Sequence, residues 1–161
     1  MSITGGYTIN HGPAYAGMVA DNEPYNIVSK LNTTANVIPF GKGVVASGED
    51  GITVATAGST AVDFVGVAAY TLNRAYNQGE AFGAQAKMTA DIATMGVVWV
   101  KAAEAVTARD AVFLRVGATD TGDFSNAAGT GATLSVQIPN AKFLGTAAKG
   151  ELVKISFVVG G

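Results

Sequence analysis

The sequence predicts an all-β protein, a single domain of short, mostly antiparallel strands with an extended N-terminal arm. Three observations predict this class. Apolar residues recur at every second position, valine-rich runs are bounded by Gly, Ser or Asp, and the chain lacks the spacing of an amphipathic helix. The strands form a barrel or a sandwich, with a jelly-roll-like arrangement among the options. We expect the arm at residues 1–26 and the β domain at residues 27–161.

The arm is the first element. Residues 1–26 mix Gly, Pro, Asn and three tyrosines without a sustained period, which favours an extended segment over a helix. Two alternatives remain open for its role. The arm either reaches a neighbouring molecule or packs on its own domain.

The next elements are three strands. GITVATA at 51–57 and DFVGVAAY at 63–70 are short and rich in valine. The segment 81–93 is rich in alanine, but its apolar and small residues from Phe82 to Ile92 occupy every even position. Because a helix needs spacings of three and four, this alternation predicts one strand over 81–93.

Two dense apolar segments follow within residues 95–116. Val98 and Val100 share one face of the first segment, while Trp99 lies on the other, and both faces are largely apolar. Such strands are usually buried on two sides. The nine residues between them, EAVTARDAV, are too few for a βαβ crossover, so we expect a turn and antiparallel pairing.

The C-terminal part begins with loop residues and ends with a strand. DTGDFSNAAGTG at 120–131 consists of turn-forming residues. In ELVKISFVV, the residues Val153, Ile155, Phe157 and Val159 alternate onto one face, which predicts the last strand.

The composition limits the function classes. Charged residues make up 14% of the chain and the mean hydropathy is +0.31. A surface this poor in charge suggests that copies of the chain or a partner cover it, the alternative being an unusually neutral monomer. The net charge of −2 and scattered basic residues exclude nucleic-acid binding. The uncharged stretch 124–141 is broken by polar residues, so we expect no membrane segment, and we also expect no secretory signal peptide.

The sequence offers few residues for chemistry. His11 is the single histidine and cysteine is absent, so we expect no metal site, no cofactor and no histidine-activated nucleophile. Asp120 and Asp123 lie in a loop, but their spacing departs from a calcium-binding loop. Asn32 begins an Asn-Thr-Thr glycosylation motif, which carries little weight without a secretory signal.

One catalytic alternative is the tripeptide Asp120-Thr121-Gly122. Aspartic proteases use this tripeptide, and two such aspartates share a proton to activate water. A dimer could supply the two aspartates. However, the residues around the tripeptide depart from the family context, so we expect a solvated turn here instead.

Several segments together resemble a known family. DFVGVAAYTLN, VVWVKAAEAVTARDAVFLRV, GDFSN and IPNAKFLGTAAKGELVKISF occur in the order found in capsid cement, or head decoration, proteins of tailed bacteriophages. The resemblance covers residues 63–158. Arg109 stands where the family has glycine in a Gly-Asp turn, so the local turn type is expected to differ.

The resemblance implies a structural virion protein and not an enzyme. Such a protein, made in the host cytoplasm, clamps neighbouring major capsid protein subunits on the outer capsid surface, with a homotrimer as the expected assembly. The expected capsid or subunit contacts are Tyr7, Ile9, Tyr15 and Tyr25, because aromatic anchors commonly carry interface energy. The expected core and trimer packing residues are Trp99, Phe113 and Phe157. A surface module that binds a glycan or receptor through its loops is a further alternative.

Overall fold

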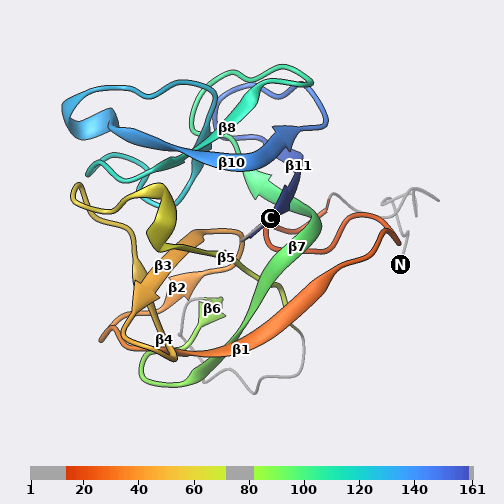
Figure 1. Cartoon of the computed structure of the whole chain (residues 1–161). Coiled ribbons are helices and arrows are strands. Elements are labelled where there is room, and N and C mark those ends of the chain that lie inside the picture. The colour runs from red at the N-terminus through yellow and green to blue at the C-terminus, as the bar shows by residue number, and fades with distance from the viewer. Residues whose placement is uncertain (1–13, 72–81, 160–161) are drawn as a thin grey trace, which may run out of the picture.

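The computed structural model describes residues 14–71 and 82–159, and it confirms the all-β fold class (Figure 1). The described residues contain no helix that is long and apolar enough to cross a membrane. The strands there are β1 (Asn26–Asn32), β2 (Ile38–Pro39), β3 (Gly43–Ser47), β4 (Gly51–Val54), β5 (Phe64–Ala68), β6 (Gly83–Ala84), β7 (Thr89–Lys101), β8 (Ala111–Arg115), β9 (Phe124–Ser125), β10 (Ser135–Phe143) and β11 (Leu152–Val158). Two short 3₁₀ helices, η1 (Ala61–Asp63) and η2 (Gly131–Thr133), precede β5 and β10.

Five strands close into a first ring, in the lower part of Figure 1. The order is β1-β4-β3-β5-β7, and β7 pairs back onto β1. Among the strand pairs of the described residues, β1–β4 is the parallel one, and it joins just Leu31 to Gly51 and Asn32 to Ile52. The ring is therefore a small barrel. Its core is made of Ile38, Val44, Ile52, Ala68, Ala84, Ala90 and Ile92.

The second half of β7 starts a second ring, with the order β7-β11-β10-β8-β9. A bridge between Ala102 and Phe124 closes this ring. The larger core takes residues from both rings, such as Val67 of β5 and Phe143 of β10. The two rings therefore share both the strand β7, drawn in green in Figure 1, and a packed core.

The prediction of one continuous strand over 81–93 is wrong, because the segment is divided between β6 and the start of β7. A turn interrupts it, in which the Met88 amide donates to the Gln85 carbonyl oxygen at 3.3 Å and Lys87 has φ +57°. The alternation is correct after the turn, since Ala90 and Ile92 are buried in the first ring. From Thr89 the strand then runs without interruption to Lys101.

The antiparallel pairing expected between the two segments of 95–116 is also wrong. β11 and β10 lie between β7 and β8 in the sheet. The residues that connect β7 to β8 form hydrogen bonds with other parts of the chain. The Ala103 amide donates to the Phe124 carbonyl at 2.7 Å, and the Val106 amide donates to the Ala147 carbonyl at 2.9 Å. The alternation expected for the last strand is confirmed over Val153, Ile155 and Phe157, which are all buried.

The described end of the arm packs on its own domain. The Gly17 amide donates to the Trp99 carbonyl at 2.7 Å, and the Ala20 amide donates to the Val97 carbonyl at 2.8 Å. This contact lies along the edge of β7 that β1 uses, because β11 occupies the other edge. Gly17 has φ +83°, and a Cβ there would lie 2.5 Å from the Ala68 carbonyl oxygen, so this approach requires glycine.

Candidate functional site

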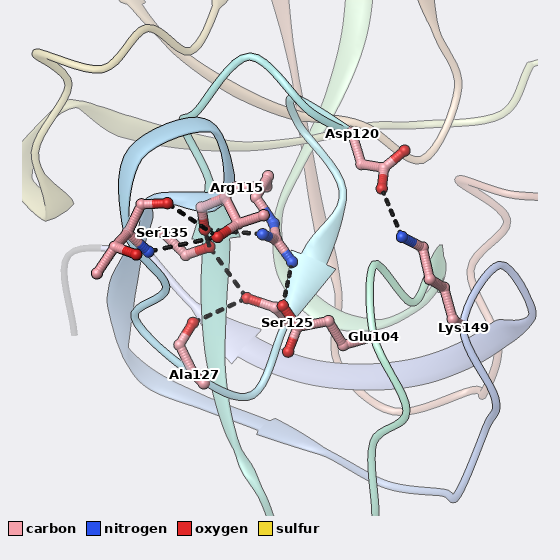
Figure 2. Close-up of polar contacts among 9 residues, drawn as sticks. Glu104, Arg115, Asp120, Ser125, Ala127, Ser135 and Lys149 are labelled. Atoms are coloured by element: carbon pink, nitrogen blue, oxygen red, sulfur yellow. Dashed lines mark hydrogen bonds and ion pairs between the residues drawn. The ribbon is translucent and has the colours of Figure 1, made fainter.

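A buried polar cluster surrounds Arg115 in the second ring (Figure 2). The Arg115 side chain is 2% exposed, and its Nη2 lies 2.5 Å from Glu104 Oε1. Its Nη1 donates to the Thr133 carbonyl at 2.7 Å, and the Ser135 hydroxyl donates to the same carbonyl at 3.1 Å. Ser125 and Ser135 join through their hydroxyls at 3.1 Å. These contacts tie β8, β9, β10 and η2 together.

The aspartate of the protease-like tripeptide lies in a turn at the surface. The Asp123 amide donates to the Asp120 carbonyl at 3.0 Å, and Asp120 has φ +55°. The Asp120 carboxylate pairs with Lys149 Nζ at 3.5 Å, as Figure 2 shows. The chemistry of an aspartic protease needs two carboxylates that share a proton. In this chain the described partner of the Asp120 carboxylate is Lys149 and not a second carboxylate.

The second aspartate of this loop is buried. Asp123 is 1% exposed, and its Oδ1 lies 2.7 Å from Lys42 Nζ. Its Oδ2 lies 3.9 Å from Lys101 Nζ and accepts no hydrogen bond. Burial raises the pKa of the Asp123 carboxyl above its ordinary value, and the contact with Lys42 partly opposes this shift. Asp123 therefore links the loop before β3, the end of β7 and the start of β9.

The glycosylation motif has a structural explanation. Asn32, the start of the glycosylation motif, is fully buried. Its amide donates to the carbonyls of Asn36, Ala84 and Gln85 at 3.0 to 3.1 Å, so this asparagine is inaccessible and joins β1 to β6. Across residues 14–71 and 82–159, no three side chains of His, Asp or Glu gather as a metal site requires.

An exposed aromatic cluster lies where the described chain begins. The rings of Tyr15 and Tyr70 stack with centroids 5.2 Å apart, and Phe40 meets Tyr70 edge-on at 5.3 Å. With Phe82, they line a hollow of about 370 Å³ whose other lining residues, Ala16 and Pro39, are also uncharged. Tyr15 and Phe82 are 61% and 68% exposed. An exposed apolar surface of this kind is typical of a contact with another protein.

The structure places the predicted contact residues in three different settings. Tyr7 and Ile9 lie outside the described residues. Tyr15 belongs to the aromatic cluster. Tyr25 is 55% exposed, and its backbone packs against Gly96, where β7 passes from the first ring to the second. Phe40, Tyr70 and Phe82 were not predicted, because folding alone brings these distant positions together.

The predicted packing residues also differ in their surroundings. Phe157 is buried in the larger core and meets Phe64 edge-on at 6.1 Å. Trp99 is half-buried, and Lys154 Nζ lies 5.4 Å from its ring centroid. Phe113 is half-buried on β8, opposite Gln137 of β10. Phe157 is thus a core residue, and the other two remain open to contact with a second molecule.

The chain matches a protein-family model described as structural cement protein (E217 gp24/Pam3 gp6) over residues 3–158. The chain belongs to this family. It is therefore a structural component of the phage capsid, and the expected resemblance is confirmed. No curated protein matches the sequence.

Two solved structures resemble this cement protein. The first is titled "The capsid of Myoviridae Phage XM1", with a TM-score of 0.72, 18% identity and 98% of each chain covered. The second is the head fiber gp8.5 N base of bacteriophage phi29, with a TM-score of 0.43, 11% identity, and coverage of 82% of this chain and 94% of that chain. At this identity, the likeness to the XM1 capsid chain establishes a shared fold.

Proposed function

We propose that this cement protein binds the outer surface of the assembled capsid as a homotrimer and clamps neighbouring major capsid protein subunits together. The observation that carries the proposal is the family match, which spans nearly the whole chain. The exposed, uncharged aromatic cluster supports it, because such a surface suits burial against another protein.

The physical basis of the clamp is linkage. A protein that binds the assembled shell and not the free subunits stabilises the shell by mass action. Each bound copy that touches two subunits adds contact area at their junction, and several copies joined in a trimer bind with higher avidity than one. The low charge of the chain fits this role. Surface that is buried against the capsid or against another copy needs no charged side chains to keep the protein soluble.

Thermal opening of capsids tests the proposal. Particles assembled without this protein should open and release DNA at a lower temperature than particles that carry it. Adding back the purified protein should restore the higher opening temperature. An unchanged opening temperature, or failure of the protein to sediment with particles, would contradict the proposed clamp.

A pair of variants tests the contact surface. Tyr15→Ser removes one exposed ring of the aromatic cluster and should weaken binding to particles that lack the protein. Val62→Ser is the matched control, because Val62 is 93% exposed on η1 and does not line this hollow. Equal binding of both variants would remove the aromatic cluster from the capsid contact. The oligomeric state of the isolated protein, measured by light scattering, tests the trimer.

A further inference from the structure

Lys42 and Asp123 form a buried ion pair that joins the two rings. Lys42 immediately precedes β3 of the first ring, and Asp123 immediately precedes β9 of the second ring. Their side chains are 23% and 2% exposed, and Lys42 Nζ lies 2.7 Å from Asp123 Oδ1. Since Oδ1 is bonded to Cγ, Nζ is at most the length of a carboxyl C–O bond farther from that carbon. The ion pair therefore places an amine nitrogen beside a carboxyl carbon.

The surrounding backbone holds the two side chains in this position. The Gly43 amide donates to the Gly122 carbonyl at 2.8 Å, and Lys42 Nζ donates to the Thr121 carbonyl at 3.0 Å. Gly122 has φ +81°, and a Cβ there would lie 3.1 Å from Cδ of Lys42, so the lysine stem packs on this glycine. Positioning of this kind removes much of the entropic cost of a reaction between two groups.

The surroundings of the Asp123 carboxyl also favour a reaction with an amine. Burial raises its pKa above the ordinary value and the charge of Asp120 adds to this shift, whereas Lys42 and Lys101 oppose it. A raised pKa favours the neutral acid, which a lysine amine can attack as a nucleophile. Oδ2 accepts no hydrogen bond, and Lys101 Nζ lies 3.9 Å from it. A positive charge at this place stabilises negative charge that develops on Oδ2.

We propose that Lys42 and Asp123 condense to an isopeptide bond between Nζ and Cγ, with release of one water molecule. A proton first passes from the Lys42 ammonium to Oδ1, which leaves a neutral amine and a neutral acid. The amine lone pair attacks Cγ, and the electrons of the Cγ–Oδ2 π bond move onto Oδ2 beside Lys101. Nζ gives a second proton to Oδ1, the Cγ–Oδ1 bond breaks, and Oδ1 leaves as water while the Cγ–Oδ2 double bond forms again. The step consumes no other reactant.

The bond adds a covalent link between two rings that already share β7 and a packed core. A link between positions far apart in the chain restricts the unfolded state, as a disulfide does. Because it forms within one chain, it depends neither on capsid binding nor on the trimer. Protein that has not yet condensed keeps the ion pair described above, and its Asp123 carboxyl still titrates.

Mass spectrometry of the purified, denatured protein tests the proposal. After incubation in the folded state, the chain should be lighter than its sequence by one water molecule. Trypsin should fail to cut at the acylated Lys42, so peptide 31–74 should be recovered joined to peptide 116–142. Cyclisation of Asp50 onto the Gly51 amide also releases water, but it leaves peptide 31–74 unlinked. The joined peptides therefore identify the isopeptide bond.

Three variants sharpen the test. Lys42→Arg keeps the positive charge but lacks the amine, so it should keep its full mass. Lys154→Arg is the matched control, because Lys154 lies 3.1 Å from Asp21 in an ion pair whose side chains are 33% and 41% exposed. This variant should still lose water. Lys101→Met removes the charge beside Oδ2 and should slow the condensation roughly tenfold or more.

The wild-type chain decides the proposal even if a variant fails to fold. A wild-type mass that stays equal to the full sequence after prolonged incubation would overturn the isopeptide bond. So would a loss of water that persists in Lys42→Arg, or a lost water that maps to peptide 31–74 alone. Joined peptides that form in Lys101→Met as fast as in the wild type would overturn the role given to Lys101.

Discussion

The turn that precedes β8 allows a test of whether glycine is favoured over arginine where the backbone is left-handed. Arg109 occupies the position where the resembling family has glycine, and it has φ +78°. The backbone of Arg109 therefore has the left-handed conformation that glycine adopts freely. The Asp110 amide donates to the Thr107 carbonyl at 3.2 Å, and the Asp110 carboxylate accepts from the Thr107 amide and the Asn126 side chain, both at 2.9 Å.

Replacing Arg109 with glycine should stabilise the protein. A non-glycine residue in this conformation costs about 1–2 kcal/mol, whereas glycine loses about 0.5–1 kcal/mol more backbone entropy on folding. The net gain is about 0.5–1 kcal/mol. The Arg109 side chain is exposed, and the bond from its amide to the Phe143 carbonyl at 2.8 Å survives the substitution. With an unfolding entropy of about 2.1 cal/mol/K per residue, this gain raises Tm by about 2–3 °C.

Calorimetry or thermal unfolding followed by circular dichroism measures this shift. Ala108→Gly is the matched control, because Ala108 lies in the same turn without a positive φ. It should lower Tm by about 2–3 °C, since it adds the entropy cost of glycine and relieves no strain. A Tm for Arg109→Gly that is unchanged or reduced, in a protein that still folds, would refute the reasoning.

Three further predictions concern buried or partly buried side chains. Asn32→Asp should destabilise the protein by about 3 kcal/mol or more in urea unfolding, because it buries a carboxylate against three carbonyls, whereas exposed Asn36→Asp should have little effect. The raised pKa of Asp123 means that the folded state binds its proton more tightly than the unfolded state. Stability should therefore fall as pH rises from the ordinary value of 3.8 through the raised pKa, and an Asp123→Asn variant with the same pH slope would contradict this. Trp99→Ala should lower Tm or the mass measured by light scattering. If both quantities stay unchanged, Trp99 is not a packing residue of the core or of an interface.

The candidate site was predictable in part. The sequence singles out Tyr15 and Tyr25 as contact residues, and both are exposed in the structure, as such a contact requires. It gives no sign that Phe40, Tyr70 and Phe82 gather beside Tyr15, because their proximity depends on how β2, β5 and the chain before β1 pack. The buried position of Arg115 was also missed, since its partners Glu104 and Thr133 lie 11 and 18 residues away in the sequence.

The sequence by itself determined the all-β class and which residues of the strands face inward. Side-chain alternation is a local property of an extended chain, so Ile92, Val98 and Phe157 follow from pattern alone. The tertiary structure decided which strands are neighbours. Pairing joins residues far apart in the chain, and many pairings satisfy the same alternation. The turn at Lys87 and the insertion of β10 and β11 between β7 and β8 depend on those long-range contacts.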